Sequence, residues 1–92
     1  MIVGFRNRGL KRFFETGDAR ALDPGHVNRI RRILARLNAA TSIRDLDSPG
    51  SRLHPLKGNR QSQWAVDVDR HWRITFTFDG RDCSDLDYED YH

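Results

Sequence analysis

Hydrophobic residues near the start of the chain follow two patterns in turn. Residues 2–5 form a short apolar run, which predicts a first strand. After it, apolar residues recur three and four positions apart, the spacing of one face of an α-helix. Asn7 is placed to cap this helix, and Gly17 is placed to end it because glycine tolerates the left-handed backbone of a helix C-terminus. The predicted apolar face consists of Leu10, Phe13 and Phe14.

A second and stronger helix is predicted from Asp23-Pro24 onward. Aspartate is a favoured helix cap, and proline is favoured at the first helical position. A helix with one apolar face packs that face on a core and leaves its other side to solvent. The apolar face predicted here consists of Val27, Ile30, Ile33, Leu34 and Leu37.

The second half of the chain predicts a β-meander. Residues 41–58 are irregular, but Leu53 and Leu56 can anchor a short edge strand. Asp79-Gly80 predicts a two-residue hairpin turn, because both residues tolerate positive φ. The expected fold is α+β, a single domain over residues 1–92, with two N-terminal helices packed on one face of a small, mostly antiparallel sheet. The alternation of apolar and polar residues that marks its strands covers residues 64–68, 72–78 and 86–88.

Composition agrees with one ordinary soluble domain. The 92 residues are 37% hydrophobic and 32% charged, which is typical of a globular protein rather than a disordered or membrane-embedded one. No apolar run approaches the roughly 20 residues that span a bilayer, and the first residues lack the apolar core of a secretory signal. The single cysteine, Cys83, excludes an internal disulfide, so we expect the reducing cytoplasm. In a strand, Cys83 is more typical of a small packed side chain than of a catalytic thiol.

Positive charge is concentrated in the first two thirds of the chain. Residues 1–60 carry 13 Lys/Arg against 5 Asp/Glu, whereas residues 61–92 carry 3 against 8. Most of the positive charge is arginine, whose planar fork of donors fits phosphate. This distribution fits a nucleic-acid-binding surface or a solvated basic face whose partners lie on the acidic last strand. Three arginines share one face of the second helix: Arg29, Arg32 and Arg36.

Arg73 lies in the middle of a predicted strand. If the aromatic residues of this strand face the core, Arg73 points the other way with its neighbours Thr75 and Thr77. There it could grip a phosphate, or it could pair with Asp85 or Asp87 on the next strand. The residues alone leave both possibilities open.

Two further groups of polar residues could take part in chemistry. His54 and Lys57 flank a proline in residues 52–58, and histidine exchanges a proton near neutral pH, as RNA cleavage by 2′-hydroxyl attack requires. A histidine before proline is also common in loops with only a structural role. The other group is the C-terminus, where tyrosine can stack on a base and histidine or aspartate can move protons, unless the tail is merely frayed. Its members are Asp90, Tyr91 and His92.

Metal and cofactor chemistry is not indicated. The four histidines are scattered, and neither HxxxH nor CxxC spacing appears, so we expect no metal site and no cofactor. The sequence also lacks a glycine-rich phosphate loop, a nucleophile elbow and a dinucleotide-binding fingerprint.

Three segments together resemble the signature blocks of a known family. They are Arg52-Leu53-His54-Pro55-Leu56-Lys57-Gly58, Trp72-Arg73-Ile74-Thr75-Phe76 and Asp87-Tyr88-Glu89-Asp90-Tyr91-His92. In order and spacing they are similar to the blocks of HigB-type toxins, also called plasmid-maintenance killer proteins, of the RelE/ParE superfamily. The stretch Phe13-Phe14-Glu15-Thr16-Gly17 is similar as well. The resemblance therefore covers nearly the whole chain.

This resemblance implies a fold, an activity and a set of partners. The fold is the RelE-like microbial RNase fold, and the activity is that of a ribosome-dependent endoribonuclease, an mRNA interferase, which cuts messenger RNA in the ribosomal A site without a metal. The implied partner is a cognate helix-turn-helix antitoxin, through which alone the toxin reaches operator DNA. The catalytic residues implied by motif position are His54, Lys57, Arg73, Asp90, Tyr91 and His92. The candidates for contact with RNA or the ribosome are Arg29, Arg32, Arg36 and Arg52.

Two alternative functions fit the residues less fully. A non-catalytic RNA- or DNA-binding module needs only the basic helix and exposed aromatic side chains, and it predicts that His54→Ala leaves the cellular effect intact. A subunit that only docks a partner protein predicts no growth arrest when the chain is expressed alone.

Overall fold

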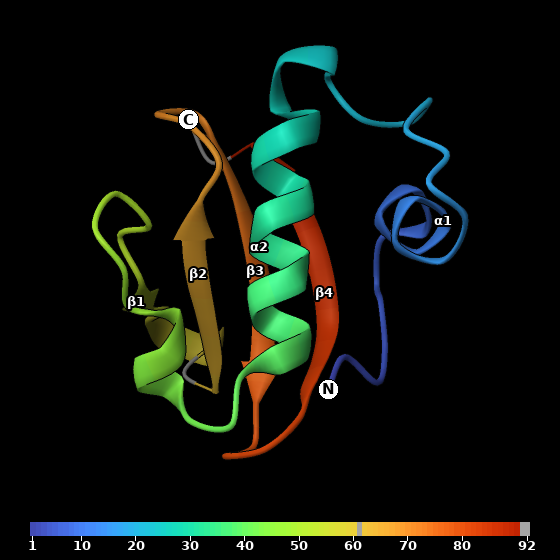
Figure 1. Ribbon diagram of the computed structural model, residues 1–92. Helices are drawn as coiled ribbons and strands as arrows, with labels where there is room; N and C mark the ends of the chain where they lie inside the picture. The colour runs from blue at the N-terminus through green and yellow to red at the C-terminus, as the bar shows by residue number, and fades with distance from the viewer. Residues whose placement is uncertain (61, 91–92) are drawn as a thin grey trace.

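The four strands of the fold form one sheet in the order β1-β2-β3-β4, with antiparallel pairing between all neighbours. This computed structural model describes residues 1–60 and 62–90. The α+β class and the mostly antiparallel sheet expected from the sequence are confirmed (Figure 1). The elements are α1 (Arg8–Thr16), α2 (Val27–Ala39), β1 (His54–Pro55), β2 (Gln63–Asp67), β3 (Trp72–Phe78) and β4 (Cys83–Asp90), with short 3-10 turns η1 (Pro24–His26), η2 (Ile43–Leu46) and η3 (Gly58–Arg60).

Asn7 caps α1 as the sequence predicts, whereas Asp23 caps a 3-10 turn that precedes α2. The Asn7 side chain accepts a hydrogen bond from the backbone N–H of Leu10, and Gly17 ends α1 with a φ of 82°. Asp23 likewise accepts from the N–H of Gly25. The first turn after Asp23 is a 3-10 turn, and the α-helix proper starts only at Val27. The second helix is therefore confirmed, with a tighter first turn than the pattern predicts.

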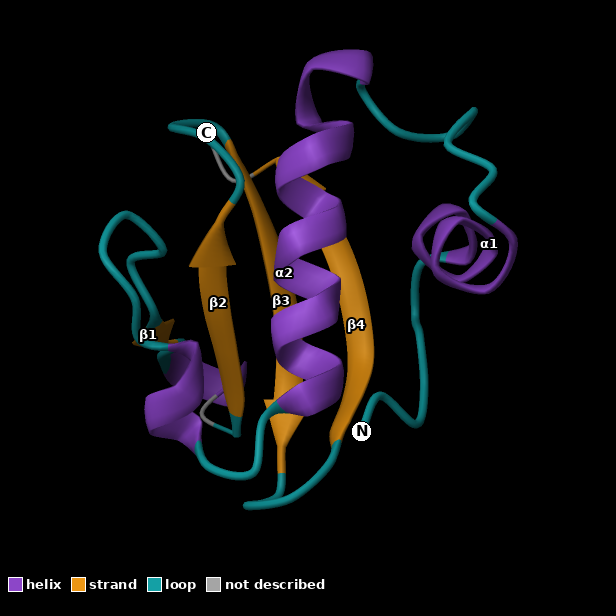
Figure 2. Cartoon of the chain, viewed as in Figure 1, coloured by secondary structure: helices purple, strands orange, loops and turns teal. Residues whose placement is uncertain are grey.

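The core lies between α2 and the sheet. Figure 1 and Figure 2 show α2 lying along the strands over one face of the sheet, with α1 seen end-on beside it, on the β4 side. Full burial of each large aliphatic side chain in such a layer contributes roughly 1.5–3 kcal/mol. Among the described residues, no helix is both long and apolar enough to cross a membrane. The side chains excluded almost completely from water include Leu10, Ile30, Leu34, Leu37, Ile74, Phe76 and Leu86.

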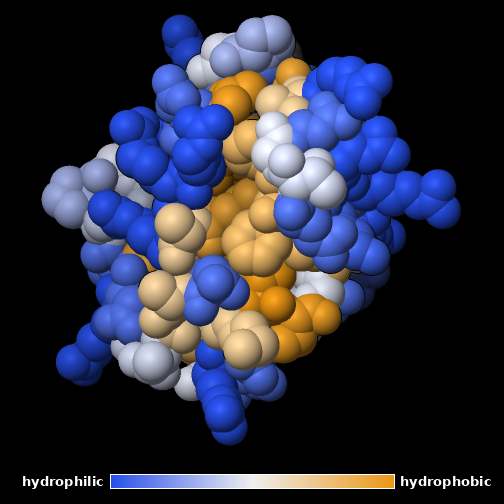
Figure 3. Space-filling model, turned by 45° about the vertical axis from the view of Figure 1, so that its right-hand side comes forward, coloured by the Kyte–Doolittle hydropathy of each residue, from blue (hydrophilic) through white to orange (hydrophobic). Residues whose placement is uncertain are grey.

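One predicted core residue of α1 lies at the surface. Phe14 is 38% exposed, whereas Phe13 is buried. A hollow of about 300 Å³ lies between the helices, and both phenylalanines line it together with Leu34. Apolar side chains gather on this face of the molecule (Figure 3). The prediction that Phe14 belongs to the buried face of the helix is therefore wrong: its ring borders this hollow and the ring of Phe5, 5.6 Å away, instead of entering the core.

Two local predictions about the sheet are also wrong. Residues 2–5 form no strand, and only two isolated parallel bridges join them to β4, Ile2 to Cys83 and Phe5 to Leu86. The β3–β4 connection is a four-residue loop, residues 79–82, rather than a two-residue turn. The Asp79 side chain accepts the backbone N–H groups of Arg81 and Asp82, and these bonds stabilise the longer loop.

Strand β4 contains a bulge that shifts its register against β3. Thr77 faces Ser84, but Thr75 faces Asp87, so β4 has one extra residue between these pairs. Asp85 lies in this stretch with a φ of 55°, a left-handed conformation that few non-glycine residues adopt. The bulge decides which acidic residue of β4 faces Arg73.

Cys83 is a packing residue, as its place in a strand predicts. Its side chain is fully buried, its Sγ lies 3.5 Å from the carbonyl of Leu37, and burial raises the pKa of the thiol to about 11. Because the thiolate is the reactive form, we expect Cys83 to react with a disulfide reagent only after unfolding. Absorbance of the released thiol chromophore measures this directly, and rapid labelling of the native protein would contradict it.

Candidate active site

The face of the sheet turned away from α2 gathers several of the predicted site residues. Register places His54 beside Ala65, Ala65 beside Thr75, and Thr75 beside Asp87. Arg73 faces Glu89 one row further along. Because paired residues of antiparallel strands share a face, His54 and Arg73 lie on the same side of the sheet. This face is the candidate active site.

Glu89 is the centre of an ion-pair network on this face. Its carboxylate accepts hydrogen bonds from Arg60 at 2.6 Å, from Arg73 at 3.1 Å and from the Thr75 hydroxyl at 3.2 Å. The bonds from Arg60, and then those from Arg73, hold the pKa of Glu89 below its usual range. The carboxylate therefore stays ionised and fixes both guanidinium groups. The alternative prediction that Arg73 pairs with Asp85 or Asp87 is wrong, because the register sets it opposite Glu89.

A groove of about 510 Å³ runs along this face beside the network. Arg60, Gln63 and Glu89 line it, together with Thr77 of β3. Thr75, however, is fully buried. Thr75 points away from the core face as expected, but it is not open to a ligand, because its hydroxyl is used by Glu89. Arg73 has a side chain that is 15% exposed and lies beside the groove rather than lining it, and the β4 side of the groove is acidic through Asp85, Asp87 and Glu89.

His54 is held in one tautomer by the backbone. Its Nδ1 lies 2.7 Å from the carbonyl oxygen of Arg52, and a carbonyl can only accept, so Nδ1 carries the proton and donates. In the neutral ring Nε2 is then the basic nitrogen, which suits a general base. Lys57 is exposed three residues later, just before Gly58, which turns the chain with a φ of 73°. His54 thus lies in the edge strand β1, and Lys57 follows that strand in the chain.

The predicted C-terminal residues are only partly placed. Asp90 is exposed at the end of β4, opposite Trp72. Strand alternation sets it on the face opposite to that of Glu89, at the edge of the sheet. Tyr91 and His92 lie outside the described residues. The structure thus brings His54 and Arg73 to one face and places Asp90 at the end of β4 on the other face.

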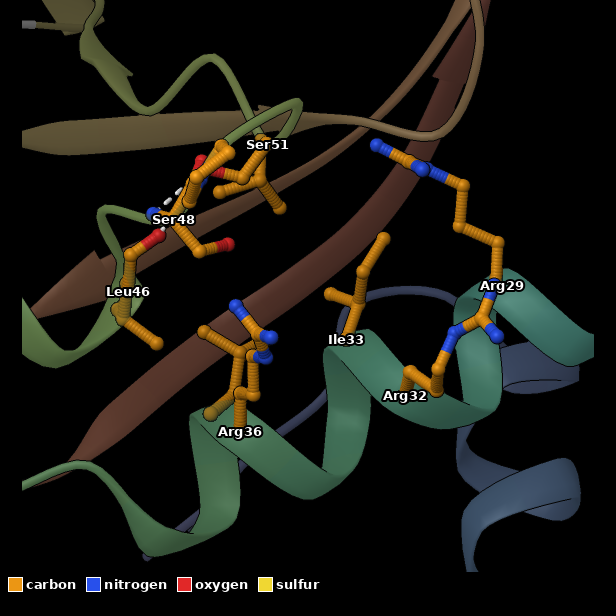
Figure 4. A pocket seen from close by; sticks show the side chains of 10 residues that line it. Arg29, Arg32, Ile33, Arg36, Leu46, Ser48 and Ser51 are labelled. Carbon is orange, nitrogen blue, oxygen red and sulfur yellow. Dashed lines mark hydrogen bonds between the residues drawn. The ribbon is translucent and has the colours of Figure 1, made fainter.

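The four arginines predicted to contact RNA differ in how they are held. Arg29 donates to the backbone carbonyls of Asp67 at 3.2 Å and Gly50 at 2.7 Å, so it ties α2 to β2 and to the loop before β1. Arg52 pairs with the buried Asp67 at 3.4 Å while its own side chain stays 79% exposed. Arg32 and Arg36 are exposed, and both line the same hollow as Arg29 (Figure 4).

A buried polar network missed by sequence reasoning lies on the other face of the same strands. His26 is 6% exposed, and both of its ring nitrogens are used, Nδ1 with the Tyr88 hydroxyl and Nε2 with Asp69, each at 2.6 Å. Trp72 stacks against Tyr88 with ring centroids 4.5 Å apart. Spacing could have revealed His26, because it precedes Ile30 by four residues and so continues the apolar face of α2. No local signal joins it to Asp69 or Tyr88.

Because of Asp69, the stability of the fold is expected to fall as the solution is made acidic. Hydrogen bonds from the backbone N–H of His71, and then from His26, lower the pKa of Asp69 from 3.8 to about 2. A lowered folded-state pKa means that the ionised carboxylate stabilises the fold above pH 3.8, and this contribution is lost as the pH falls toward 2. Thermal unfolding of wild type and Asp69→Asn at pH 4 and pH 2 tests this. We expect the wild type to lose more stability than the variant over that interval, and equal losses would contradict it.

The fold is that of the RelE-like toxins. YoeB from Staphylococcus aureus, solved as a dimer, matches 99% of this chain and 94% of its own with a TM-score of 0.61 at 19% identity. The YoeB–YefM complex from the same organism matches 100% of this chain and 95% of its own, with a TM-score of 0.58 at 18% identity. Among the described residues, no group of three or more histidine, cysteine or acidic side chains is placed to hold a metal ion.

Sequence comparison gives the family. The family of HigB-like toxins, described as the RelE-like toxin of type II toxin–antitoxin system HigB, matches residues 3–92. "Endoribonuclease HigB" of Proteus vulgaris is 42% identical over 92 residues, the whole of both chains. The chain therefore belongs to the HigB-like toxins of type II toxin–antitoxin systems.

Proposed function

We propose that this chain is an endoribonuclease that cuts messenger RNA on the ribosome, in the A site, and so arrests growth. The observation that carries the proposal is the shared face of His54 and Arg73, a base-competent imidazole and a fixed guanidinium beside a groove. The 42% identity to an endoribonuclease supports the same chemistry. We treat residues 1–92 as one toxin domain.

The proposed reaction is attack of a 2′-hydroxyl on the adjacent phosphorus. This forms the O2′–P bond and breaks the P–O5′ bond, which leaves a 2′,3′-cyclic phosphate and a 5′-hydroxyl. One of His54 and His92 takes the proton from the 2′-hydroxyl, and the other gives a proton to the leaving 5′-oxygen. Arg73 and Lys57 stabilise the charge on the phosphorane oxygens. Asp90 orients a histidine or assists proton transfer, and Tyr91 stacks on or positions a base.

The ribosome completes this site by presenting the message in the reactive geometry. A substrate held near its attack geometry reacts far faster than a free one, so free RNA should be cut slowly. Arg32 and Arg36, with Arg29 and Arg52, supply the cationic surface for RNA.

The proposed partner in the cell is a small antitoxin with a helix-turn-helix, which neutralises the toxin and carries it to operator DNA. Membership of a type II toxin–antitoxin family supports such a partner, and a fold neighbour has been solved as the YoeB–YefM complex. We place the toxin in the cytoplasm, where messenger RNA is translated.

Tightly controlled expression of the chain in bacteria tests the proposed function. We expect growth arrest and messages cut at codon boundaries, both relieved by His54→Ala and by His92→Ala. A basic binding module without catalysis predicts arrest that survives both substitutions with messages intact, and a docking subunit predicts no arrest. Soluble protein of each variant, checked by gel filtration, is the control.

A further inference from the structure

A second hollow lies away from the candidate active site, between α2 and the loop that follows η2. Its volume is about 230 Å³. Arg29, Arg32 and Arg36 form its α2 side, and Figure 4 shows the Arg36 side chain rising from the helix toward the Ser48 side. Apolar side chains, among them Ile33 and Leu46, form its floor. None of the described residues that line it is acidic, so the hollow combines strong positive charge with an apolar base.

The wall opposite α2 is rigid. The Ser51 hydroxyl donates toward the backbone carbonyls of Ser48 at 2.8 Å and Leu46 at 3.2 Å, and it accepts from the N–H of Ser48 at 3.2 Å. Arg29 closes one end by holding Gly50. These contacts fix the wall opposite α2 and one end of the hollow, which is called the slot below.

Arg32 and Arg36 are the groups left for a ligand. Both are exposed, and among the described residues no hydrogen bond or ion pair engages their guanidinium groups, in contrast with Arg29. A guanidinium can bind phosphate through its fork and stack on a planar base. An apolar floor below two such groups fits a flat ring attached to an anion.

We propose that this slot holds one unstacked nucleotide of single-stranded RNA, with its base on Ile33 and Leu46 and its phosphate against Arg32 and Arg36. The slot is closed on the side of Ser48 and Ser51, so it admits a single planar group better than it admits a helix of a partner protein. The presence of RNA at this protein rests on the proposed function; the slot itself does not.

The slot is close enough to the candidate active site for one RNA strand to reach both. Ser51 lines the slot, and His54 lies three residues further along the chain. Three residues span at most roughly 11 Å. The slot and His54 are therefore only a short distance apart, on either side of the edge strand β1. In this proposal the RNA passes around that edge of the sheet.

Binding of a hexanucleotide with 2′-O-methyl groups tests the slot without cleavage, since the attacking hydroxyl is blocked. Fluorescence anisotropy at several salt concentrations gives both affinity and salt slope. Ser48→Phe fills the slot at constant charge, and we expect about tenfold weaker binding with an unchanged slope. Arg36→Ala removes one phosphate contact, and we expect the slope to fall by about 0.7. Ser48→Ala and Arg8→Ala, the latter on α1, are matched controls expected to bind within about twofold of wild type.

Either class of variant can overturn the proposal. Wild-type affinity for Ser48→Phe, with a native circular dichroism spectrum, excludes a base in the slot. If Ser48→Phe does not fold, Arg36→Ala decides, and an effect no larger than that of Arg8→Ala excludes the site. Tighter binding of a hexaglutamate peptide, lost in Ser48→Phe, assigns the slot to an acidic protein instead. If the wild type cleaves messages and the slot variants bind and cleave RNA as well as it does, the proposed function stands. Only the proposal of a nucleotide in the slot is then overturned.

Discussion

Replacing Arg73 with alanine is expected to lower the rate of RNA cleavage about 100- to 1,000-fold, the usual cost of losing one preformed donor to a transition-state oxyanion. The guanidinium is held by Glu89 at 3.1 Å on the groove face, so it needs no reorganisation when charge develops on the phosphorane. The substitution should destabilise the fold only modestly, by about 1–2 kcal/mol, because Glu89 keeps Arg60 at 2.6 Å.

Single-turnover cleavage of translated RNA measures this effect, and urea unfolding measures the stability. Arg81→Ala is the matched control, since Arg81 is exposed in the loop at the far end of β3. We expect it to keep cleavage within about twofold of wild type, the range of a surface substitution. Cleavage by Arg73→Ala at the rate of Arg81→Ala would remove Arg73 from the mechanism and leave it with a structural role beside Glu89.

Replacing His26 with alanine is expected to give the largest loss of stability, about 3 kcal/mol, against a total of roughly 5–15 kcal/mol for a small domain. The substitution leaves a cavity beside Trp72 and leaves the Tyr88 hydroxyl without its 2.6 Å partner. Asp69 contributes less to this loss, because its side chain is 43% exposed and water can replace His26 there.

Two variants separate the parts of this effect in urea unfolding. Tyr88→Phe removes only the hydroxyl and keeps the stack on Trp72, so we expect a loss of about 1 kcal/mol. His71→Ala removes an exposed histidine, and we expect a change within about 0.5 kcal/mol. An unfolding midpoint for His26→Ala equal to that of His71→Ala would show that the network does not stabilise the fold.

The helices could be predicted because their signals are local. The capping side chains of Asn7 and Asp23 act within three residues, and the apolar spacing of α2 follows directly from the helical repeat. The alternation of β3 and β4 also predicted which residues face α2. The exposure of Phe14 could not be read in this way, because it depends on how α1 and α2 meet.

The partner of Arg73 shows where the sequence was insufficient. A two-residue turn at Asp79-Gly80 would set Arg73 opposite Leu86, beside Asp85 and Asp87. The four-residue loop adds two residues and the bulge adds one, which moves the partner to Glu89. Register is thus fixed by the hydrogen bonds of a single loop and one residue with positive φ, and neither follows from hydrophobic patterning.

The buried network shows a second limit. Asp69 and Tyr88 lie 43 and 62 positions after His26 in the sequence. Only the packing of η1 on the sheet brings the three residues together. The candidate site, in contrast, could be predicted in part, because the resemblance to HigB-type toxins supplied His54 and Arg73, and the strand order then set both on one face.

The most direct test of the central claim is the cleavage of one defined message by the purified toxin in a reconstituted translation reaction, with and without ribosomes. We expect cuts at the codon in the A site only when ribosomes translate, with 2′,3′-cyclic phosphate ends, and no such cuts with Arg73→Ala. Equal cleavage of the free message, or an intact message on translating ribosomes, would contradict a ribosome-dependent endoribonuclease.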